Sequence, residues 1–192
     1  MQRIARFALA ALAVLALAAC QRAGSQAGPA PAAAGAIKQL SAGTLVAGKP
    51  LAAPRGKVVL TLSGAIGARN RGGALALDLA SLHRMRTVQL VATEPFLKRK
   101  VTFTGVLVSD LLALAKVPAS ATQVHMHALD DYQVDFKLTD VAASRMLLAT
   151  KADGKPIPVG KAGPIRIVFP DDATLGRNSD LWIWSVNQMR LH

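Results

Sequence analysis

The sequence predicts an α+β domain built on a mixed, mainly β sheet with short helices. Three observations favour this class. Short runs rich in β-branched and aromatic residues recur from residue 58 to the C-terminus. Brief segments with helical spacing and capping residues lie between some of these runs. The two kinds of segment alternate irregularly, which argues against regular βαβ winding and for a mixed sheet.

Each expected strand is a short apolar run bounded by turn residues. A glycine-containing turn at residues 69–73 joins the first two strands, and an acidic turn at residues 130–131 joins the middle pair. In the fourth strand apolar and polar residues alternate, which places Phe103 and Gly105 on one face. The last strand would carry both tryptophans on one face. The expected strands cover residues 58–62, 74–77, 87–92, 101–107, 122–129, 132–138, 146–150, 165–169 and 182–191.

Three short helices are expected between the strands, each starting at a residue whose side chain can accept a hydrogen bond from the first turn. Asp78 is the expected N-cap of a helix over residues 79–85. Ser109 is expected to cap the next helix, and Thr139 the third.

The N-terminus predicts an export signal. Two arginines precede an apolar run at residues 7–19, which is shorter than the about 20 residues that span a bilayer. The run ends in Leu-Ala-Ala-Cys, which resembles the lipobox of bacterial lipoproteins. We therefore expect a signal peptide over residues 1–19, cleavage before Cys20, and acylation of Cys20 by chains such as palmitate. The residue after Cys20 is Gln21 and not Asp, which favours an anchor in the outer membrane, on its periplasmic side.

The composition changes after this signal. Residues 20–36 combine the acylated Cys20 with Ala, Gly, Pro, Ser and Gln, which is typical of a flexible linker. Residues 37–192 are expected to form one domain, because about 150 residues can build one proper core.

Charge and cysteine usage exclude several function classes. Cys20 is the only cysteine, so its acylation leaves no thiol for a disulfide, a nucleophile or a thiolate metal site. Removal of residues 1–19 takes away two arginines and no acidic residue, which changes the formal net charge from +12 to +10. The basic residues are scattered and the chain is exported, which together argue against nucleic-acid binding.

Four pieces in order resemble the sulfite oxidase-type molybdopterin-binding domain. They are Phe-Thr-Gly-Val at 103–106 with Asp-Leu-Leu at 110–112, Ala-Leu-Asp-Asp-Tyr at 128–132, Gly-Pro-Ile-Arg-Ile-Val-Phe-Pro at 163–170, and the Trp-containing last strand. Together they span about 90 residues of the expected domain. The resemblance implies that family's fold and a pterin as the ligand.

The departures from the family pattern concern the metal. Enzymes of this family hold molybdenum through a Cys about a dozen residues before the glycine that corresponds to Gly105, and Thr93 stands there. A hydroxyl is a poor substitute for a thiolate, since it stays protonated and lacks a soft donor atom. The domain also starts too late to contain the N-terminal extension of the large enzymes. The resemblance is therefore closest to small, stand-alone exported members.

The resemblance and the chemistry of a flat pterin ring select the candidate ligand-binding residues. Phe96 could stack on the ring and Glu94 could accept from its edge, although a strand-ending turn with Phe96 in the core is the alternative. Asp130 and Tyr132 could line the pocket mouth, and the alternative is an ordinary turn. The segment at residues 177–179 could hold an anionic tail, and the alternative is an exposed loop. Trp184 is a further candidate, and the alternative is a buried core tryptophan. The candidates are Thr93, Glu94, Phe96, Asp130, Tyr132, Arg177, Asn178, Ser179 and Trp184.

These expectations lead to one function and two alternatives. The favoured function is a non-catalytic lipoprotein that senses a pterin, without a metal, and signals to a membrane partner, as some small family members do. The partner would be the periplasmic domain of a cyclic-di-GMP-turnover enzyme or a sensor kinase. One alternative is a molybdopterin-dependent oxidoreductase that lacks the usual Cys ligand. The other is a scaffold for protein–protein contact.

Overall fold

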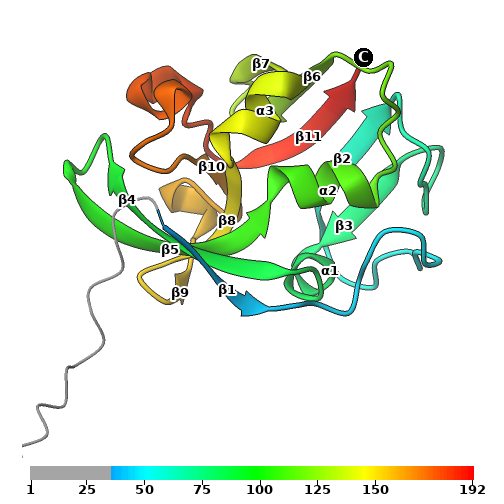
Figure 1. Ribbon diagram of the computed structural model, residues 1–192. Helices are drawn as coiled ribbons and strands as arrows, with labels where there is room; N and C mark the ends of the chain where they lie inside the picture. The colour runs from blue at the N-terminus through cyan, green and yellow to red at the C-terminus, as the bar shows by residue number, and fades with distance from the viewer. Residues whose placement is uncertain (1–35) are drawn as a thin grey trace, which may run out of the picture. The chain divides into compact units, whose positions relative to one another are not determined.

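The structure, a computed structural model, describes residues 36–192 as two packed sheets (Figure 1). In the first sheet the order is β1-β4-β5-β8-β10, with β9 paired to β8. In the second the order is β3-β2-β11-β6-β7. Every strand pair in this part of the chain is antiparallel except β2 with β11. The mixed, mainly β architecture predicted from the sequence is confirmed.

The strands follow the apolar runs of the sequence closely in the middle of the domain. β1 and β9 were not expected from the pattern. The first sheet contains β1 (Ile37–Ser41), β4 (Thr87–Glu94), β5 (Arg99–Leu107), β8 (Leu147–Ala152), β9 (Lys155–Pro156) and β10 (Arg166–Val168). The second contains β2 (Val58–Gly64), β3 (Leu75–Asp78), β6 (Gln123–Ala128), β7 (Gln133–Lys137) and β11 (Val186–Leu191).

Of the three predicted helix caps, only Asp78 is confirmed. Its carboxylate accepts the hydrogen bond from the Ser81 N–H at 2.7 Å. Ser109 and Thr139 lie inside the first turns of their helices, so both predictions are wrong. β5 and β7 run directly into these helices, and the last strand residue becomes the N-cap in an extended conformation. The helices are α1 (Leu79–His83), α2 (Val108–Leu114), α3 (Leu138–Ser144) and the 3-10 helices η1 (Val159–Lys161), η2 (Thr174–Arg177) and η3 (Ser179–Leu181).

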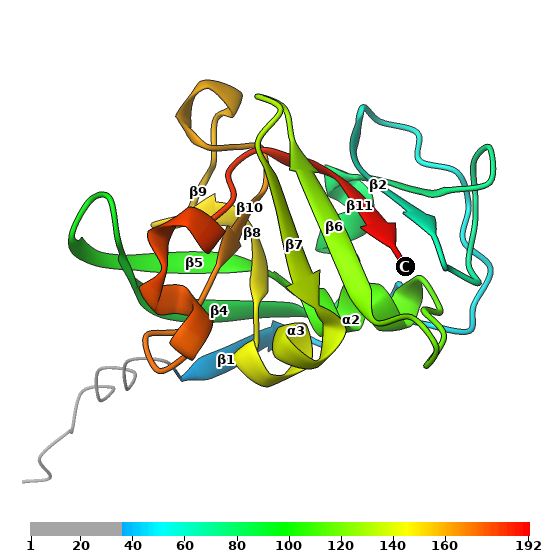
Figure 2. The same cartoon turned by 90° about the horizontal axis from the view of Figure 1, so that it is seen from above.

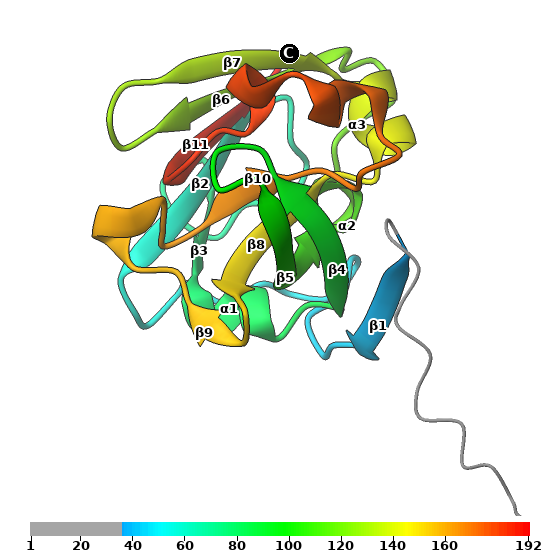
Figure 3. The ribbon, with the colours of Figure 1, turned by 90° about the vertical axis from the view of Figure 1, so that its left-hand side faces the viewer.

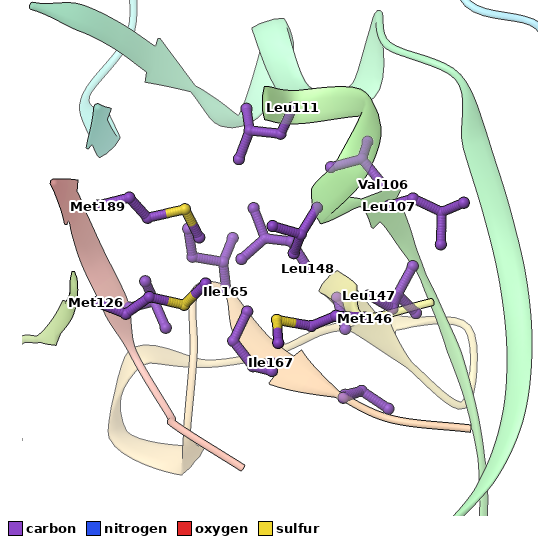
Figure 4. Close-up of a cluster of buried hydrophobic side chains, with 14 of the residues drawn as sticks. Val106, Leu107, Leu111, Met126, Met146, Leu147, Leu148, Ile165, Ile167 and Met189 are labelled. Atoms are coloured by element: carbon purple, nitrogen blue, oxygen red, sulfur yellow. The ribbon is translucent and has the colours of Figure 1, made fainter. Parts of the chain in front are cut away.

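The core lies between the two sheets (Figure 4). Met126 of β6 and Met189 of β11 point toward Leu148 of β8 and Ile167 of β10, and all four side chains are buried. Gly105 of β5 lets β8 approach closely, because a Cβ atom built there would lie 2.0 Å from the Leu148 carbonyl oxygen. Burial of these side chains is the main source of stability for the sandwich.

The predicted last strand is too long. β11 begins at Val186, whereas we expected strand structure from residue 182. Ser185 has a φ of 50°, a left-handed conformation that interrupts the extended run. The two tryptophans consequently do not share a strand face: Trp182 is 4% exposed and Trp184 is 37% exposed. This irregular segment is bound to β10 by a hydrogen bond from the Ile167 N–H to the Ile183 carbonyl.

The predicted signal peptide, Cys20 and the linker up to residue 35 lie outside the described residues. Within residues 36–192, no helix has the length and apolar character needed to cross a bilayer.

Candidate functional site

A cleft of about 540 Å³ opens at one end of the two sheets, where four separate segments meet. They are the β4–β5 turn, the β6–β7 turn, the β9–β10 loop that contains η1, and the segment before β11. Figure 3 shows the β4–β5 turn between these loops, and Figure 2 shows the same turn extending from the sheet in the view from above. We call this site the Trp184 cleft. Its lining residues are Glu94, Phe96, Leu97, Leu129, Asp130, Val159, Gly160, Lys161, Ala162, Arg166, Trp184 and Ser185.

Two aromatic side chains form the wall of the cleft. The rings of Phe96 and Trp184 meet edge to face, with centroids 4.9 Å apart and an angle of 72° between their planes. Phe96 is 51% exposed, so it is not the core residue of the alternative interpretation. Aromatic rings that stay accessible beside a concavity can stack on a flat ligand.

Large hydrophobic side chains are concentrated at this end of the domain. Among residues 36–192, six of the eight large hydrophobic side chains that are exposed line the Trp184 cleft or the hollow beside it. An exposed apolar cluster of this kind marks a binding surface more often than it marks ordinary surface. The six are Phe96, Leu97, Leu129, Tyr132, Val159 and Trp184.

Glu94 lies at the base of the cleft and is 1% exposed. One carboxylate oxygen accepts hydrogen bonds from the N–H groups of Phe96 and Leu97, at 2.9 and 2.6 Å. The other accepts from Nη2 of Arg166 at 2.8 Å. Glu94 therefore fixes the turn that presents Phe96, and its two oxygens are engaged within the protein. We had expected this carboxylate to face the ligand edge.

Arg166 is the buried cation behind the aromatic wall, and its side chain is 8% exposed. Its guanidinium carbon lies 5.2 Å from the ring centroid of Trp184, 5.7 Å from that of Phe103 and 5.9 Å from that of Trp182. Burial lowers the pKa of Arg166, and the hydrogen bond and the charge of Glu94 oppose this shift. Its Nε is the one buried side-chain nitrogen or oxygen in the described part of the chain without a hydrogen-bond partner.

Arg166 is a site residue that our sequence reasoning missed. The signal was present, because a charged residue inside the apolar run at 165–169 is buried only when it is paired. Nothing in the sequence identifies the partner, since Glu94 lies 72 positions earlier in the chain.

Asp130, Tyr132 and Ser179 come together in a smaller hollow of about 240 Å³ that shares Phe96 and Trp184 with the cleft. The Tyr132 hydroxyl donates to the Asp180 carbonyl at 2.9 Å, which ties the β6–β7 turn to η3. The structure thus brings together Glu94, Phe96, Asp130, Tyr132, Ser179 and Trp184 of the predicted set.

Thr93, Arg177 and Asn178 line neither hollow. Thr93 points to the opposite side of β4 from Glu94, and its N–H donates to a carboxylate oxygen of Asp171 at 2.6 Å. Burial raises the pKa of Asp171, but hydrogen bonds from Lys100 and Thr93 and the Lys100 charge outweigh it and lower the pKa overall. The Asn178 side chain caps η3. Arg177 is exposed at the end of η2.

The described residues offer few metal ligands. Between residues 36 and 192 there is no group of three or more His, Cys, Asp or Glu side chains arranged to hold a metal ion. The Thr93 hydroxyl, on the opposite side of β4 from Glu94, lies 3.4 Å from an Asp171 carboxylate oxygen.

Comparison with known proteins gives a family. No curated protein sequence is significantly similar to this chain. The crystal structure of the sulfane dehydrogenase SoxCD from Paracoccus pantotrophus is similar, with a TM-score of 0.55 and 17% sequence identity over 69% of this chain. The match covers 37% of that SoxCD chain, and at this identity it supports the fold alone. The family model described as the oxidoreductase molybdopterin binding domain matches residues 75–189. This chain therefore belongs to the oxidoreductase molybdopterin-binding domain family.

Proposed function

We propose that this protein binds a pterin in the Trp184 cleft and does not catalyse a reaction on it. The observation that carries the proposal is the accessible pair of rings, Phe96 and Trp184, on the wall of a cleft of about 540 Å³. Trp184 would stack on the flat ring and Phe96 would close one edge. The family of the chain binds a molybdopterin, which gives the ligand class.

The donor set fits the organic ring of such a cofactor better than its metal. The cleft offers aromatic faces, backbone groups and charged side chains, which are groups that bind a heteroaromatic ring. A molybdenum ion bound as in the family enzymes needs a thiolate, and residues 36–192 contain no cysteine. Thr93, at the corresponding sequence position, points away from the cleft toward Asp171. The alternative, a molybdopterin-dependent oxidoreductase, would have to use an oxygen ligand or the pterin dithiolene alone.

The second part of the proposal is that pterin binding is a signal. The predicted signal peptide and acylated Cys20 would hold the domain at the outer membrane, on its periplasmic side. The six exposed hydrophobic side chains around the cleft would then form the surface that a membrane partner contacts. A ligand bound among them would change that surface, so occupancy would alter partner affinity. The partner class remains the periplasmic domain of a cyclic-di-GMP-turnover enzyme or a sensor kinase.

The test is to purify the full chain in detergent and to measure bound pterin, by fluorescence after release, and molybdenum on the same sample. We expect pterin without stoichiometric molybdenum. Stoichiometric molybdenum together with turnover would overturn the non-catalytic proposal in favour of the oxidoreductase. The scaffold alternative holds if no pterin co-purifies and added biopterin does not raise the melting temperature of the protein.

A variant pair tests the location. Phe96→Ala should weaken biopterin binding by more than about 1 kcal/mol, the usual scale for loss of a large aromatic contact. Leu40→Ala is the matched control, because Leu40 is 48% exposed and does not line the cleft. Equal affinities of the two variants would remove Phe96 from the site.

A further inference from the structure

The charged residues of the domain are unevenly distributed along the chain. Residues 36–77 contain six lysines and arginines and no aspartate or glutamate, whereas all eleven acidic residues lie within residues 78–192. A second basic cluster, at residues 98–100, is partly neutralised, because Arg99 pairs with Asp153 and Lys100 pairs with Asp171. The first part of the domain therefore carries the largest excess of positive charge.

The segments that carry this charge are tied together by hydrogen bonds. The Asn70 side-chain amide, in the β2–β3 turn, donates to a carbonyl of the loop at residues 42–57 at 3.1 Å. A backbone N–H of the same turn donates to the Ala115 carbonyl at the end of α2 at 2.9 Å. The N–H of Thr44 donates to the carbonyl of Arg84, directly after α1, at 2.7 Å. Basic residues that are far apart in the sequence consequently share one surface.

Five cations line two adjacent hollows between these segments, and we call this surface the basic face. The hollows measure about 210 and 410 Å³ and share Pro50 and Leu51. All five cationic side chains are exposed, and none of them forms an ion pair within residues 36–192. The five are Lys49, Arg69 and Lys116 in the smaller hollow and Arg55 and Arg84 in the larger one.

One acidic residue borders the basic face, and its carboxylate is engaged within the protein. Asp78 is 5% exposed, and it accepts hydrogen bonds from the N–H and the hydroxyl of Ser81 at 2.7 and 2.6 Å and from the Gly56 N–H at 2.8 Å. No other aspartate or glutamate of the described chain lines either hollow. An anion that approaches the basic face therefore meets five cations without an exposed carboxylate among them.

An exposed apolar side chain accompanies these cations. Val46 is 40% exposed and lies in the same loop as Lys49 and Arg55. It is one of the two exposed large hydrophobic side chains of residues 36–192 that border neither the Trp184 cleft nor the hollow beside it. Cations beside an exposed apolar side chain are typical of surfaces that bind an anionic bilayer, because the cations pair with headgroups while the apolar group enters the interface.

The basic face and the Trp184 cleft lie on opposite sides of the domain. Figures 1 and 2 show the loop at residues 42–57 and the β2–β3 turn on one side and the β4–β5 turn on the other. The predicted linker from Cys20 to residue 36 can span at most about 55 Å. A compact domain of about 150 residues has a diameter of about 40 Å. The linker is thus long enough for either side of the domain to face the bilayer.

We propose that the basic face binds the anionic headgroups of the bilayer that holds the protein's anchor, and thereby directs the Trp184 cleft away from that bilayer. A bilayer is favoured over an acidic protein for two reasons. The predicted anchor at Cys20 keeps the domain within reach of the headgroups, and Val46 offers an apolar group to the interface. The inference does not depend on pterin binding.

The experiment compares amide hydrogen exchange of the full chain in two kinds of nanodisc. One contains phosphatidylcholine alone, and the other contains phosphatidylcholine and phosphatidylglycerol in a two-to-one ratio. Exchange at residues 44–57 and 65–74 should be slower in the anionic nanodiscs by at least about fivefold, the factor that one Lys or Arg contributes near an anionic surface. Exchange at residues 95–98, in the β4–β5 turn, should be the same in both.

Charge-reversal variants and salt assign the effect to the basic face. Lys49→Glu/Lys116→Glu should bring the exchange rates in the two nanodiscs to within about twofold of each other. Lys137→Glu/Lys155→Glu is the matched control, because it changes the net charge equally at exposed residues that line neither hollow, and it should keep the slowing. In 1 M NaCl the Debye length falls to about 3 Å, so the unmodified chain should also lose the slowing.

Three results would overturn the proposal. Equal exchange of residues 44–57 in the two nanodiscs would exclude the bilayer and leave an acidic protein as the partner class. Loss of the slowing in the control variant as well would mean that net charge, and not the basic face, attracts the domain. Slowing centred on residues 95–98 would mean that the side with the Trp184 cleft faces the bilayer. Each of these results would leave the pterin proposal unchanged.

Discussion

The buried pair of Glu94 and Arg166 gives the sharpest stability prediction. Glu94→Ala removes the acceptor of the Arg166 Nη2 hydrogen bond at 2.8 Å and leaves a guanidinium that is almost fully buried without a counter-charge. Removing one partner of a buried ion pair costs about 3–5 kcal/mol. The Phe96 and Leu97 N–H groups also lose their acceptor, but these residues are exposed and water can replace it. We therefore expect Glu94→Ala to lower the free energy of unfolding by about 4 kcal/mol.

The assay is urea unfolding of the full chain in detergent, followed by tryptophan fluorescence, with the midpoint and the m value reported for each variant. Thr93→Ala is the control, because Thr93 is next to Glu94 in the sequence but its side chain is exposed. Loss of that side chain should change the unfolding free energy by less than about 0.5 kcal/mol. The double variant Glu94→Gln/Arg166→Met removes both charges. Its loss of unfolding free energy should be smaller than the summed losses of Glu94→Gln and Arg166→Met by at least about 1.5 kcal/mol.

Two results would refute the reasoning. A loss below about 1 kcal/mol for Glu94→Ala would mean that Arg166 finds another partner or remains hydrated. Strict additivity of Glu94→Gln and Arg166→Met would mean that the two side chains contribute independently, in spite of their contact.

Two further predictions concern the sheets and α1. Gly105→Ala should destabilise the domain by about 1–3 kcal/mol or more, because the new Cβ would lie 2.0 Å from the Leu148 carbonyl oxygen; Gly160→Ala, with open space around its Cβ, should change the urea midpoint little. The pKa of Asp78 is lowered, mainly by the hydrogen bond from the Ser81 hydroxyl and also by those from the N–H groups of Ser81 and Gly56. Burial opposes this shift but does not cancel it. Because this folded-state pKa is below the unfolded value of about 3.9, Asp78 contributes stability that is present above about pH 4 and is lost as the pH falls through the folded pKa. Asp78→Asn keeps a cap acceptor and should flatten the fall in unfolding free energy between about pH 5 and pH 2; an unchanged slope would contradict the pKa shift.

Several features of the domain could be predicted because they are local. A β strand needs an apolar run bounded by turn residues, and the runs at 87–92 and 101–107 became the centre of the first sheet as β4 and β5. Asp78 could be recognised as a cap because its partner, Ser81, is three residues away. The two wrong caps, Ser109 and Thr139, failed because strands lead directly into those helices, which is a property of how the neighbouring elements pack.

The site was predictable only in part for the same reason. Phe96, Asp130 and Trp184 were selected from separate segments, and the structure places them around one cleft. Thr93 was selected with them by position in the sequence, but alternation along β4 directs adjacent side chains to opposite faces, and Thr93 lies against Asp171. Local alternation could have shown that Thr93 and Glu94 diverge, but it could not show which of the two faces the cleft.

The sequence by itself determined the α+β class, the position of most strands along the chain, the resemblance to the family and the lack of any cysteine after Cys20. Only the tertiary structure decided that Glu94 is engaged by Arg166, that Arg166 lies behind Trp184, and that Phe96, Asp130 and Trp184 line one cleft. The physical reason is the range of the interactions. Strand periodicity and capping act over a few residues, whereas the cleft is formed by segments far apart in the chain, whose meeting depends on how the two sheets bury their apolar faces.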